Sequence, residues 1–208
     1  MKRLYLLRHG QTEFNVKKLV QGRCDSPLTD LGRKQAGMAA AWLKGHDVVP
    51  DKVVSSHLGR AMDTASLVAT ELLGPDAAVE PCEGIIERSY GTFEEGPHDA
   101  LPTDVWDPGE DLVPFGGEGS KAWQERRVAT LTNLISAEDI ETLLAVSHGS
   151  ASRQFIKAAA PEGFELPAKL PNCAIMIFDF EEAKPQAEGE PMQCKFTLQQ
   201  IVDPQQGN

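Results

Sequence analysis

The sequence predicts a three-layer α/β sandwich, in which a mainly parallel central sheet is flanked by helices. Two observations support this prediction. Short apolar runs at residues 3–7, 52–55 and 142–146 have the length and composition of strands buried on both faces. Each run is followed by a segment whose apolar residues recur every three or four positions, as along one face of a helix. Such alternation is typical of parallel strands connected by helices.

The remaining elements follow in chain order. Helices are expected at residues 32–43, 60–73, 120–136 and 150–159. The segment Leu28-Thr29-Asp30 supplies a capping residue before the first of these helices. Two late strands, at 174–180 and 196–202, flank a loop at 181–191 and are expected to form an antiparallel pair at a sheet edge.

Residues 91–119 depart from the alternation of strands and helices. They contain four prolines, several acidic residues, and no Lys or Arg. Long irregular insertions of this kind are usually functional or mobile. We therefore expect one domain over residues 1–208 that carries a lid-like insertion at about 91–119.

Composition limits the partners and the compartment. A formal net charge of -11 repels polyanions, so nucleic acid is not an expected partner. No segment is long enough to span a bilayer, and Arg8 interrupts the first apolar run too early for a signal peptide. The four cysteines lack zinc-site spacing and are expected to be free thiols of a cytoplasmic protein, with Cys24 the most reactive. The oligomeric state stays open.

Polar residues directly follow three of the predicted strands. The segments are Arg8-His9-Gly10, Ser55-Ser56 with Arg60 after it, and Ser147-His148-Gly149-Ser150. Ligands of open α/β sheets bind beyond the carboxyl ends of the strands, so two histidines and two arginines are expected to converge there. Arginine binds phosphate bidentately, and the amides that open a helix bind anions. The set therefore suits phosphoryl transfer.

His9 is the expected nucleophile, because imidazole can attack phosphorus when one ring nitrogen is unprotonated. Nearby arginines would lower its pKa, and Gly10 would let the chain turn tightly past it. Thr12 and Asn15 lie within one turn and could donate to phosphate oxygens. Glu87 follows an apolar pair, where partial burial could keep its carboxyl protonated for donation to the leaving group.

These residues resemble the motifs of the histidine phosphatase superfamily, to which the cofactor-dependent phosphoglycerate mutases also belong. Five ordered blocks carry the resemblance: residues 6–15, 21–32, 56–65, 116–118 and 147–149, with Asn172 before a late strand. The resemblance implies a phosphoglycerate mutase-like fold and a phosphohistidine intermediate on His9. It further implies that Arg8, Arg60 and His148 hold the phosphoryl group, that Asn15 assists, and that Glu87 donates the proton. Further residues expected to bind phosphate or substrate are Thr12, Gln21, Gly22, Arg88, Gly149 and Ser150.

Three activities are open at this point. The segment Glu87-Arg88-Ser89-Tyr90-Gly91 resembles the mutase form of the motif. Only 30 residues separate Glu87 from Glu118, however, and the insertion between them is acidic, whereas a mutase must retain a doubly phosphorylated intermediate in a basic pocket. A phosphatase acting on a small phosphomonoester is therefore favoured. A catalytically silent phospholigand-binding protein is the third alternative, which the intact His9 and Glu87 disfavour.

Several other residues have simpler interpretations. No metal ion or cofactor is expected, since no carboxylate and histidine cluster has ligand spacing and the arginines already supply positive charge. The histidines outside the matched positions are expected to be surface or structural residues: His46, His57 and His98. Four aromatic residues could equally wall a bound substrate or pack the insertion: Tyr90, Phe93, Trp106 and Phe115. Trp42 and Trp123 are expected in the core.

Overall fold

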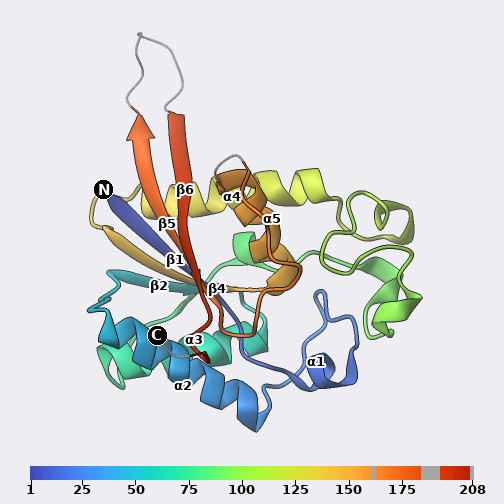
Figure 1. The fold of residues 1–208 in the computed structure, drawn as a ribbon, viewed down its shortest axis with the longest axis horizontal. Helices are drawn as coiled ribbons and strands as arrows, with labels where there is room; N and C mark the ends of the chain where they lie inside the picture. Colours follow the sequence, from blue (N-terminus) through green and yellow to red (C-terminus); the bar gives the residue numbers. More distant parts are fainter. Residues whose placement is uncertain (161–162, 184–192, 207–208) are drawn as a thin grey trace.

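The computed structural model describes residues 1–160, 163–183 and 193–206 (Figure 1). Its strands are β1 (Lys2–Arg8), β2 (Lys52–Ser55), β3 (Glu80–Pro81), β4 (Thr142–Ser147), β5 (Ile175–Ala183) and β6 (Gln193–Val202). Its α-helices are α1 (Glu13–Lys17), α2 (Asp30–Gly45), α3 (Gly59–Leu73), α4 (Ser120–Ile135) and α5 (Gly149–Ala159). All predicted strands and helices are present. The short elements α1 and β3 were not predicted, since five and two residues are too few to show a period.

The six strands form one sheet in the order β3-β2-β4-β1-β5-β6. The pairs β3–β2, β2–β4 and β4–β1 are parallel, whereas β1–β5 and β5–β6 are antiparallel. The late strands therefore form the expected antiparallel pair at one edge. They are longer than predicted, so residues 181–183 of the expected loop belong to β5. The rest of that loop lies outside the described residues.

The helices form two layers on opposite faces of this sheet (Figure 1). Along β1, Leu4 and Leu6 pack into the core beneath α4 and α5, whereas Tyr5 and Leu7 pack into the core beneath α2 and α3. Successive side chains of a strand point to opposite faces, so a run that is apolar throughout is buried on both. The three-layer sandwich predicted from the sequence is confirmed.

The insertion and α1 lie beside the same end of the sheet (Figure 1). It contains three short 3-10 turns, at Gly91–Phe93, His98–Ala100 and Val113–Phe115. Tyr90 and Leu112 form a small separate core with Val20, from the chain after α1. The irregular backbone of this segment agrees with the prediction. Packing against Val20 explains how a segment without long helices or strands is held in place.

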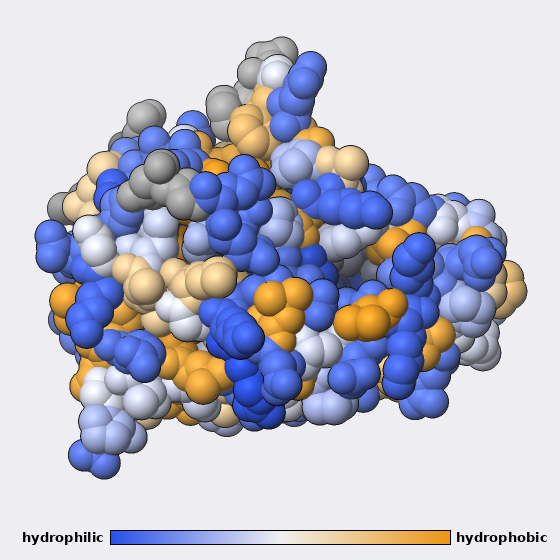
Figure 2. All heavy atoms as spheres, turned by 60° about the horizontal axis from the view of Figure 1, so that its bottom comes forward, coloured by the Kyte–Doolittle hydropathy of each residue, from blue (hydrophilic) through white to orange (hydrophobic). Residues whose placement is uncertain are grey.

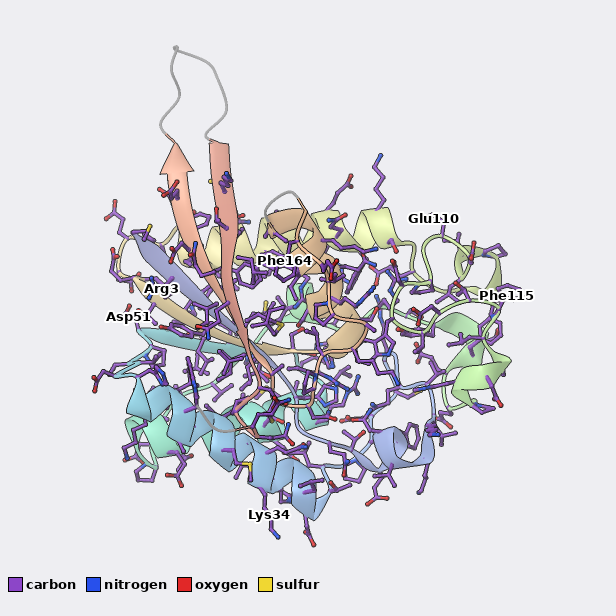
Figure 3. The ribbon with its side chains drawn as sticks, in the orientation of Figure 1. Arg3, Lys34, Asp51, Glu110, Phe115 and Phe164 are labelled. Carbon is purple, nitrogen blue, oxygen red and sulfur yellow. The ribbon has the colours of Figure 1, made fainter. Side chains whose placement is uncertain are left out.

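The surface is mostly polar. The face in Figure 2 is largely hydrophilic, and its apolar residues occur in small groups. Phe115 is 42% exposed and lies at the outer end of the insertion (Figure 3). Within the described ranges, no helix is both long enough and apolar enough to cross a membrane.

Candidate active site

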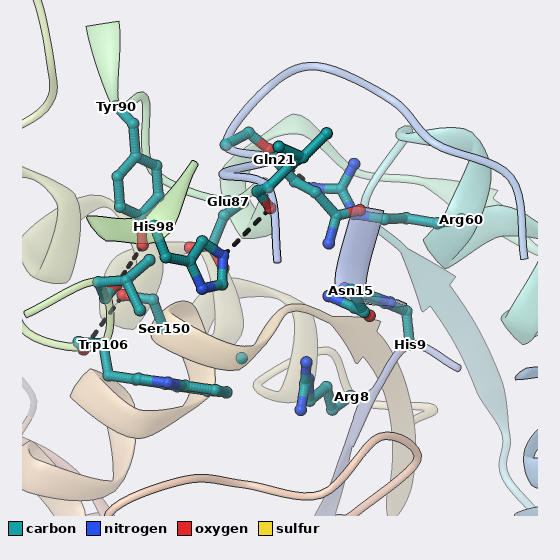
Figure 4. Close-up of a pocket in the computed structure, with 14 residues that line it drawn as sticks. Arg8, His9, Asn15, Gln21, Arg60, Glu87, Tyr90, His98, Trp106 and Ser150 are labelled. Carbon is teal, nitrogen blue, oxygen red and sulfur yellow. Dashed lines mark hydrogen bonds between the residues drawn. The ribbon is translucent and has the colours of Figure 1, made fainter. Parts of the chain in front are cut away.

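The carboxyl ends of β1 and β4 bring the two motif histidines together. These strands are parallel neighbours, and Arg8 pairs with Ser147 in their register, so the residues that follow each strand are adjacent. The rings of His9 and His148 lie 5.3 Å apart between centroids. His9 lines a pocket whose empty volume, including space open to solvent, is about 450 Å³ (Figure 4). The pocket is lined by Arg8, His9, Asn15, Leu19, Gln21, Gly22, Arg60, Glu87, Tyr90, His98, Val105, Trp106, Gly149 and Ser150.

His9 has one defined tautomer. Its Nδ1 lies 2.7 Å from the backbone oxygen of Gly10. A carbonyl oxygen only accepts, so Nδ1 carries the proton and Nε2 keeps its lone pair. Burial, together with the positive charges of Arg60 and Arg8, holds the pKa of His9 well below its ordinary value. The ring is therefore neutral at pH 7, which a nucleophile requires.

Gly10 serves close packing rather than the tight turn that the sequence suggested. It is absent from the residues with positive φ, so its backbone does not need glycine for that reason. A Cβ on Gly10 would lie 2.5 Å from the backbone oxygen of Gly32. The loop after His9 and the first turn of α2 thus approach each other through backbone atoms alone.

Two buried arginines supply the positive charge. Arg60, in the first turn of α3, donates at 2.7 Å to the backbone oxygens of Gly22 and Cys24. Arg8 donates to the backbone oxygen of Leu170, and its guanidinium lies 5.1 Å from the centre of the Trp106 ring. Burial lowers the pKa of Arg8 to about 10, so its side chain stays cationic at pH 7. Both guanidinium groups are fixed before any ligand arrives.

His148 is fully buried and forms the N-cap of α5. Neither of its ring nitrogens has a hydrogen-bond partner in the described part of the chain. Burial and the nearby Arg60 hold its pKa well below the ordinary value. A buried ring whose nitrogens lack hydrogen-bond partners is unfavourable unless a ligand supplies those hydrogen bonds. Together with the amides of Gly149 and Ser150 at the helix start, His148 is placed to bind an anion.

Glu87 is the carboxylate of the pocket. It is 6% exposed, and its Oε1 accepts a hydrogen bond of 2.9 Å from the backbone N–H of Arg88. Its carboxyl group lies close enough to interact electrostatically with the guanidinium groups of Arg8, Arg60 and Arg127. A buried carboxyl that faces the same space as His9 is in position to exchange a proton with a leaving group.

Thr12 positions the site but does not line it. Its hydroxyl donates to Gln21 Oε1 at 3.0 Å and accepts from the backbone N–H of Asn15, which caps α1. Asn15 Oδ1 accepts from Asn172 Nδ2 at 3.1 Å. This contact orients the amide group of Asn15. Thr12, which was predicted to bind phosphate, is thus placed to support Asn15 and Gln21.

Arg88 does not line the pocket either. Its side chain is fully buried, lies 4.8 Å from the centre of the Trp123 ring and donates to Ser120 Oγ at 2.7 Å. The ring and the hydroxyl of α4 hold this guanidinium in the core. Arg88, which was predicted to bind substrate, is therefore not among the described residues that line the pocket. Trp123 itself is fully buried, as predicted.

Three wall residues were not predicted. His98, Leu19 and Val105 line the pocket, although His98 was expected to be a surface or structural residue. The backbone N–H of His98 donates to Lys18 O, and an isolated antiparallel β-bridge pairs Leu19 with Pro97. These contacts hold the insertion against the chain that follows α1. No local motif marks residues whose position depends on such a contact between distant segments.

The remaining aromatic and cysteine predictions had mixed outcomes. Tyr90 and Trp106 line the pocket, whereas Phe93 and Phe115 pack against each other with ring centroids 5.0 Å apart. Trp42 is half-buried and stacks on His46, and His57 is exposed outside the pocket. The Cys24 thiol donates to Glu94 Oε2 at 3.2 Å. Burial and that carboxylate raise the pKa of Cys24 to about 12, so the prediction of a reactive thiol was wrong.

The fold and the site together define a class of protein. The sequence matches the histidine phosphatase superfamily (branch 1) over residues 4–190. The chain belongs to this superfamily, and the family predicted from its motifs is confirmed.

Individual relatives extend the likeness over the whole chain. The sequence is 29% identical over 212 residues to the probable phosphoglycerate mutase GpmB of Proteus mirabilis (strain HI4320), covering 98% of this chain and 96% of that protein. The fold is similar to a mycobacterial glucosyl-3-phosphoglycerate phosphatase, with TM-score 0.75, 24% identity and coverage of 96% and 98%. It is also similar to a phosphoserine phosphatase mutant from Entamoeba histolytica in complex with phosphoserine, with TM-score 0.74, 27% identity and coverage of 100% of each chain.

Proposed function

We propose that this chain is a phosphomonoester phosphatase that acts through a phosphohistidine on His9. The observation that carries the proposal is the neutral His9 ring, held in one tautomer beside two buried arginines and facing the same pocket as Glu87. This arrangement combines a nucleophile, fixed positive charge and a proton donor. Phosphoryl transfer needs these three components.

The reaction follows from this geometry in two steps. Nε2 of His9 attacks phosphorus, and the bond to the ester oxygen breaks as Glu87 gives that oxygen its proton. Arg8, Arg60 and His148 hold the phosphoryl oxygens during the transfer. Glu87 then removes a proton from water, the water oxygen attacks phosphorus, and the bond to Nε2 breaks. Inorganic phosphate leaves, and both side chains return to their starting states.

Relatives support both a phosphatase and a mutase. Two of the similar structures are named as phosphatases, whereas a sequence relative is named as a probable phosphoglycerate mutase. The mutase remains the second candidate, because Glu87 through Gly91 retain the mutase form of the motif. The pocket favours the phosphatase: among its described lining residues, Arg8 and Arg60 are the only Lys or Arg. A bisphosphorylated intermediate needs cations at both of its ends.

The test is phosphate release by the wild type and by His9→Ala from a panel of phosphomonoesters that includes 3-phosphoglycerate and 2,3-bisphosphoglycerate. Release that disappears in His9→Ala would support the phosphatase. His57→Ala, which changes an exposed histidine outside the pocket, is the matched control. Exchange between 2- and 3-phosphoglycerate without release would support the mutase. Absence of both reactions, with phosphate still bound, would support a silent binding protein.

Glu87→Gln tests the proton donor separately. We expect it to slow cleavage of alkyl phosphates about 10² to 10⁴-fold, the usual range for general acid catalysis. Aryl phosphates should be affected much less, because an aryl oxide leaves without a proton. Equal losses on both substrates would contradict the role of Glu87.

We also propose a cytoplasmic location, which the four free cysteines support.

A further inference from the structure

The pocket has two chemically different halves. Figure 4 places His9, Asn15 and Arg60 on one side, and Tyr90, His98 and Trp106 on the opposite side. The first half holds the reacting phosphoryl group in the proposed reaction. The second half must therefore receive the alcohol part of the ester, and its chemistry determines which alcohols fit.

The alcohol half has no cation to pair with an acid group. Among the described residues that line the pocket, Arg8 and Arg60 are the only Lys or Arg, and both hold the phosphoryl group in the proposed reaction. Arg88 is buried against Trp123. The insertion at 91–119 contains eight Asp and Glu residues and no Lys or Arg. A carboxylate or second phosphate on the substrate would lose water without gaining a charged partner, which is unfavourable.

His98 is neutral and accepts hydrogen bonds. Its Nε2 lies 3.1 Å from the backbone oxygen of Leu19, so Nε2 carries the proton and Nδ1 is left as an acceptor. Burial, with the charges of Lys169 and Lys18, lowers its pKa, so the ring does not become a cation at pH 7. Both lysines are exposed, and neither lines the pocket.

The other groups of this wall are apolar or already engaged. The Tyr90 hydroxyl donates to Val105 O at 2.6 Å, and the Ser150 hydroxyl donates to Trp106 O at 3.3 Å. The Trp106 ring already has Arg8 against it. The wall thus offers apolar surface and acceptors, which are Nδ1 of His98 and the lone pairs of the two hydroxyl oxygens. His98 Nδ1 has no proton, so it can only accept, which suits a substrate hydroxyl.

We propose that the pocket selects monophosphates of uncharged, hydroxyl-bearing alcohols over phosphorylated acids and bisphosphates, with His98 as the residue that recognises the hydroxyl. The inference rests on the proposed phosphatase reaction and adds its substrate class. It separates this chain from the relatives named for glucosyl-3-phosphoglycerate and phosphoserine, whose alcohol parts carry a carboxylate.

The decisive experiment compares glycerol 3-phosphate with 3-phosphoglycerate, which differ only in a hydroxymethyl group in place of a carboxylate. We expect kcat/KM to be about tenfold or more higher for glycerol 3-phosphate, because a site without a partner for a charged group rejects it. p-Nitrophenyl phosphate, measured with the wild type and His9→Ala, reports independently on the proposed reaction. An equal or higher kcat/KM for 3-phosphoglycerate, with His9-dependent release from the aryl ester, would overturn the substrate class and leave the phosphatase standing.

Three variants locate the selectivity. Val105→Lys adds a cation to the wall and is expected to lower the ratio of the two kcat/KM values. His98→Leu should reduce kcat/KM for glycerol 3-phosphate more than for ethyl phosphate, which has no hydroxyl to bind. Lys169→Gln should leave the ratio unchanged. A fall in activity on 3-phosphoglycerate alone in Lys169→Gln would show that the rim binds acids and would overturn the inference. If no ester gives His9-dependent release, the proposed function fails and the inference fails with it.

Discussion

Gly10→Ala tests whether the close approach of two backbone segments aims the nucleophile. The added Cβ would lie 2.5 Å from Gly32 O and 3.0 Å from Gly32 C. Both are backbone atoms, so no flexible side chain can move aside. Non-bonded carbon atoms normally stand about 3.5 to 4.0 Å from their neighbours, so the two segments must separate by about 1 Å.

Two losses follow from this separation. Overpacking of this size costs about 1 to 3 kcal/mol in the free energy of unfolding. The backbone oxygen of Gly10 also accepts the Nδ1 hydrogen bond of His9, so its displacement turns the ring away from the phosphorus. A misplacement of about 1 Å can reduce the rate about 10²-fold. We therefore expect slower phosphohistidine formation in a protein that is still folded.

The assay is rapid-quench measurement of phosphohistidine formation, with urea unfolding of the same preparations. Gly37→Ala is the matched control, because a Cβ there meets no atom within 4 Å on the exposed face of α2. That control should keep the wild-type rate and gain up to about 1 kcal/mol from helix propensity. Wild-type phosphorylation and stability in Gly10→Ala would refute the packing argument.

Three further predictions concern other buried groups. Gly149→Ala would place a Cβ 2.6 Å from the Trp106 ring, so we expect displacement of that ring and about a tenfold lower kcat/KM on alkyl phosphates; an unchanged value would contradict this. Burial lowers the pKa of Arg127 to about 10, which corresponds to a cost of about 3 kcal/mol for keeping its charged form in the folded protein. Among the described residues, no carboxylate forms an ion pair with this side chain to offset that cost. Arg127→Met should therefore unfold in urea with an unchanged or higher free energy, and a large loss would show that its hydrogen bonds dominate. The pKa values of His9 and His148 are lower in the folded protein than in the unfolded chain. As the pH falls below about 6.5, the unfolded chain therefore binds protons that the folded protein does not. The free energy of unfolding should then decrease by up to about 1.4 kcal/mol per pH unit for each ring. Urea unfolding between pH 7.5 and 5 should show a smaller slope in His9→Ala.

The parallel strands and the reacting groups could be predicted from the sequence because both depend on local order. The run Leu4 to Leu7 is apolar at every position, and a strand that is buried on both faces needs such a run. His9 and His148 each follow a strand directly. The topology of a parallel sheet carries residues in that position to one edge, whatever the details of packing.

Two side chains lie in surroundings that the sequence did not predict, and the reason is shared. Arg88 is adjacent to Glu87 in the chain, yet Trp123 and Ser120 of α4 draw its guanidinium into the core. Cys24 lies in a motif loop, yet burial and the carboxylate of Glu94, from the insertion, raise its pKa. In both cases the determining partner is many residues away, so no local pattern reveals it.

The sequence by itself thus determined the family, the fold class and the position of the motif histidines directly after strands, since these follow from residues that are neighbours in the chain. The tertiary structure alone decided the alcohol half of the pocket. His98 reaches it because its ring and backbone bond to Leu19 and Lys18, some 79 residues earlier. Contacts across such distances depend on how the insertion packs against the rest of the fold, and packing is a property of the whole chain.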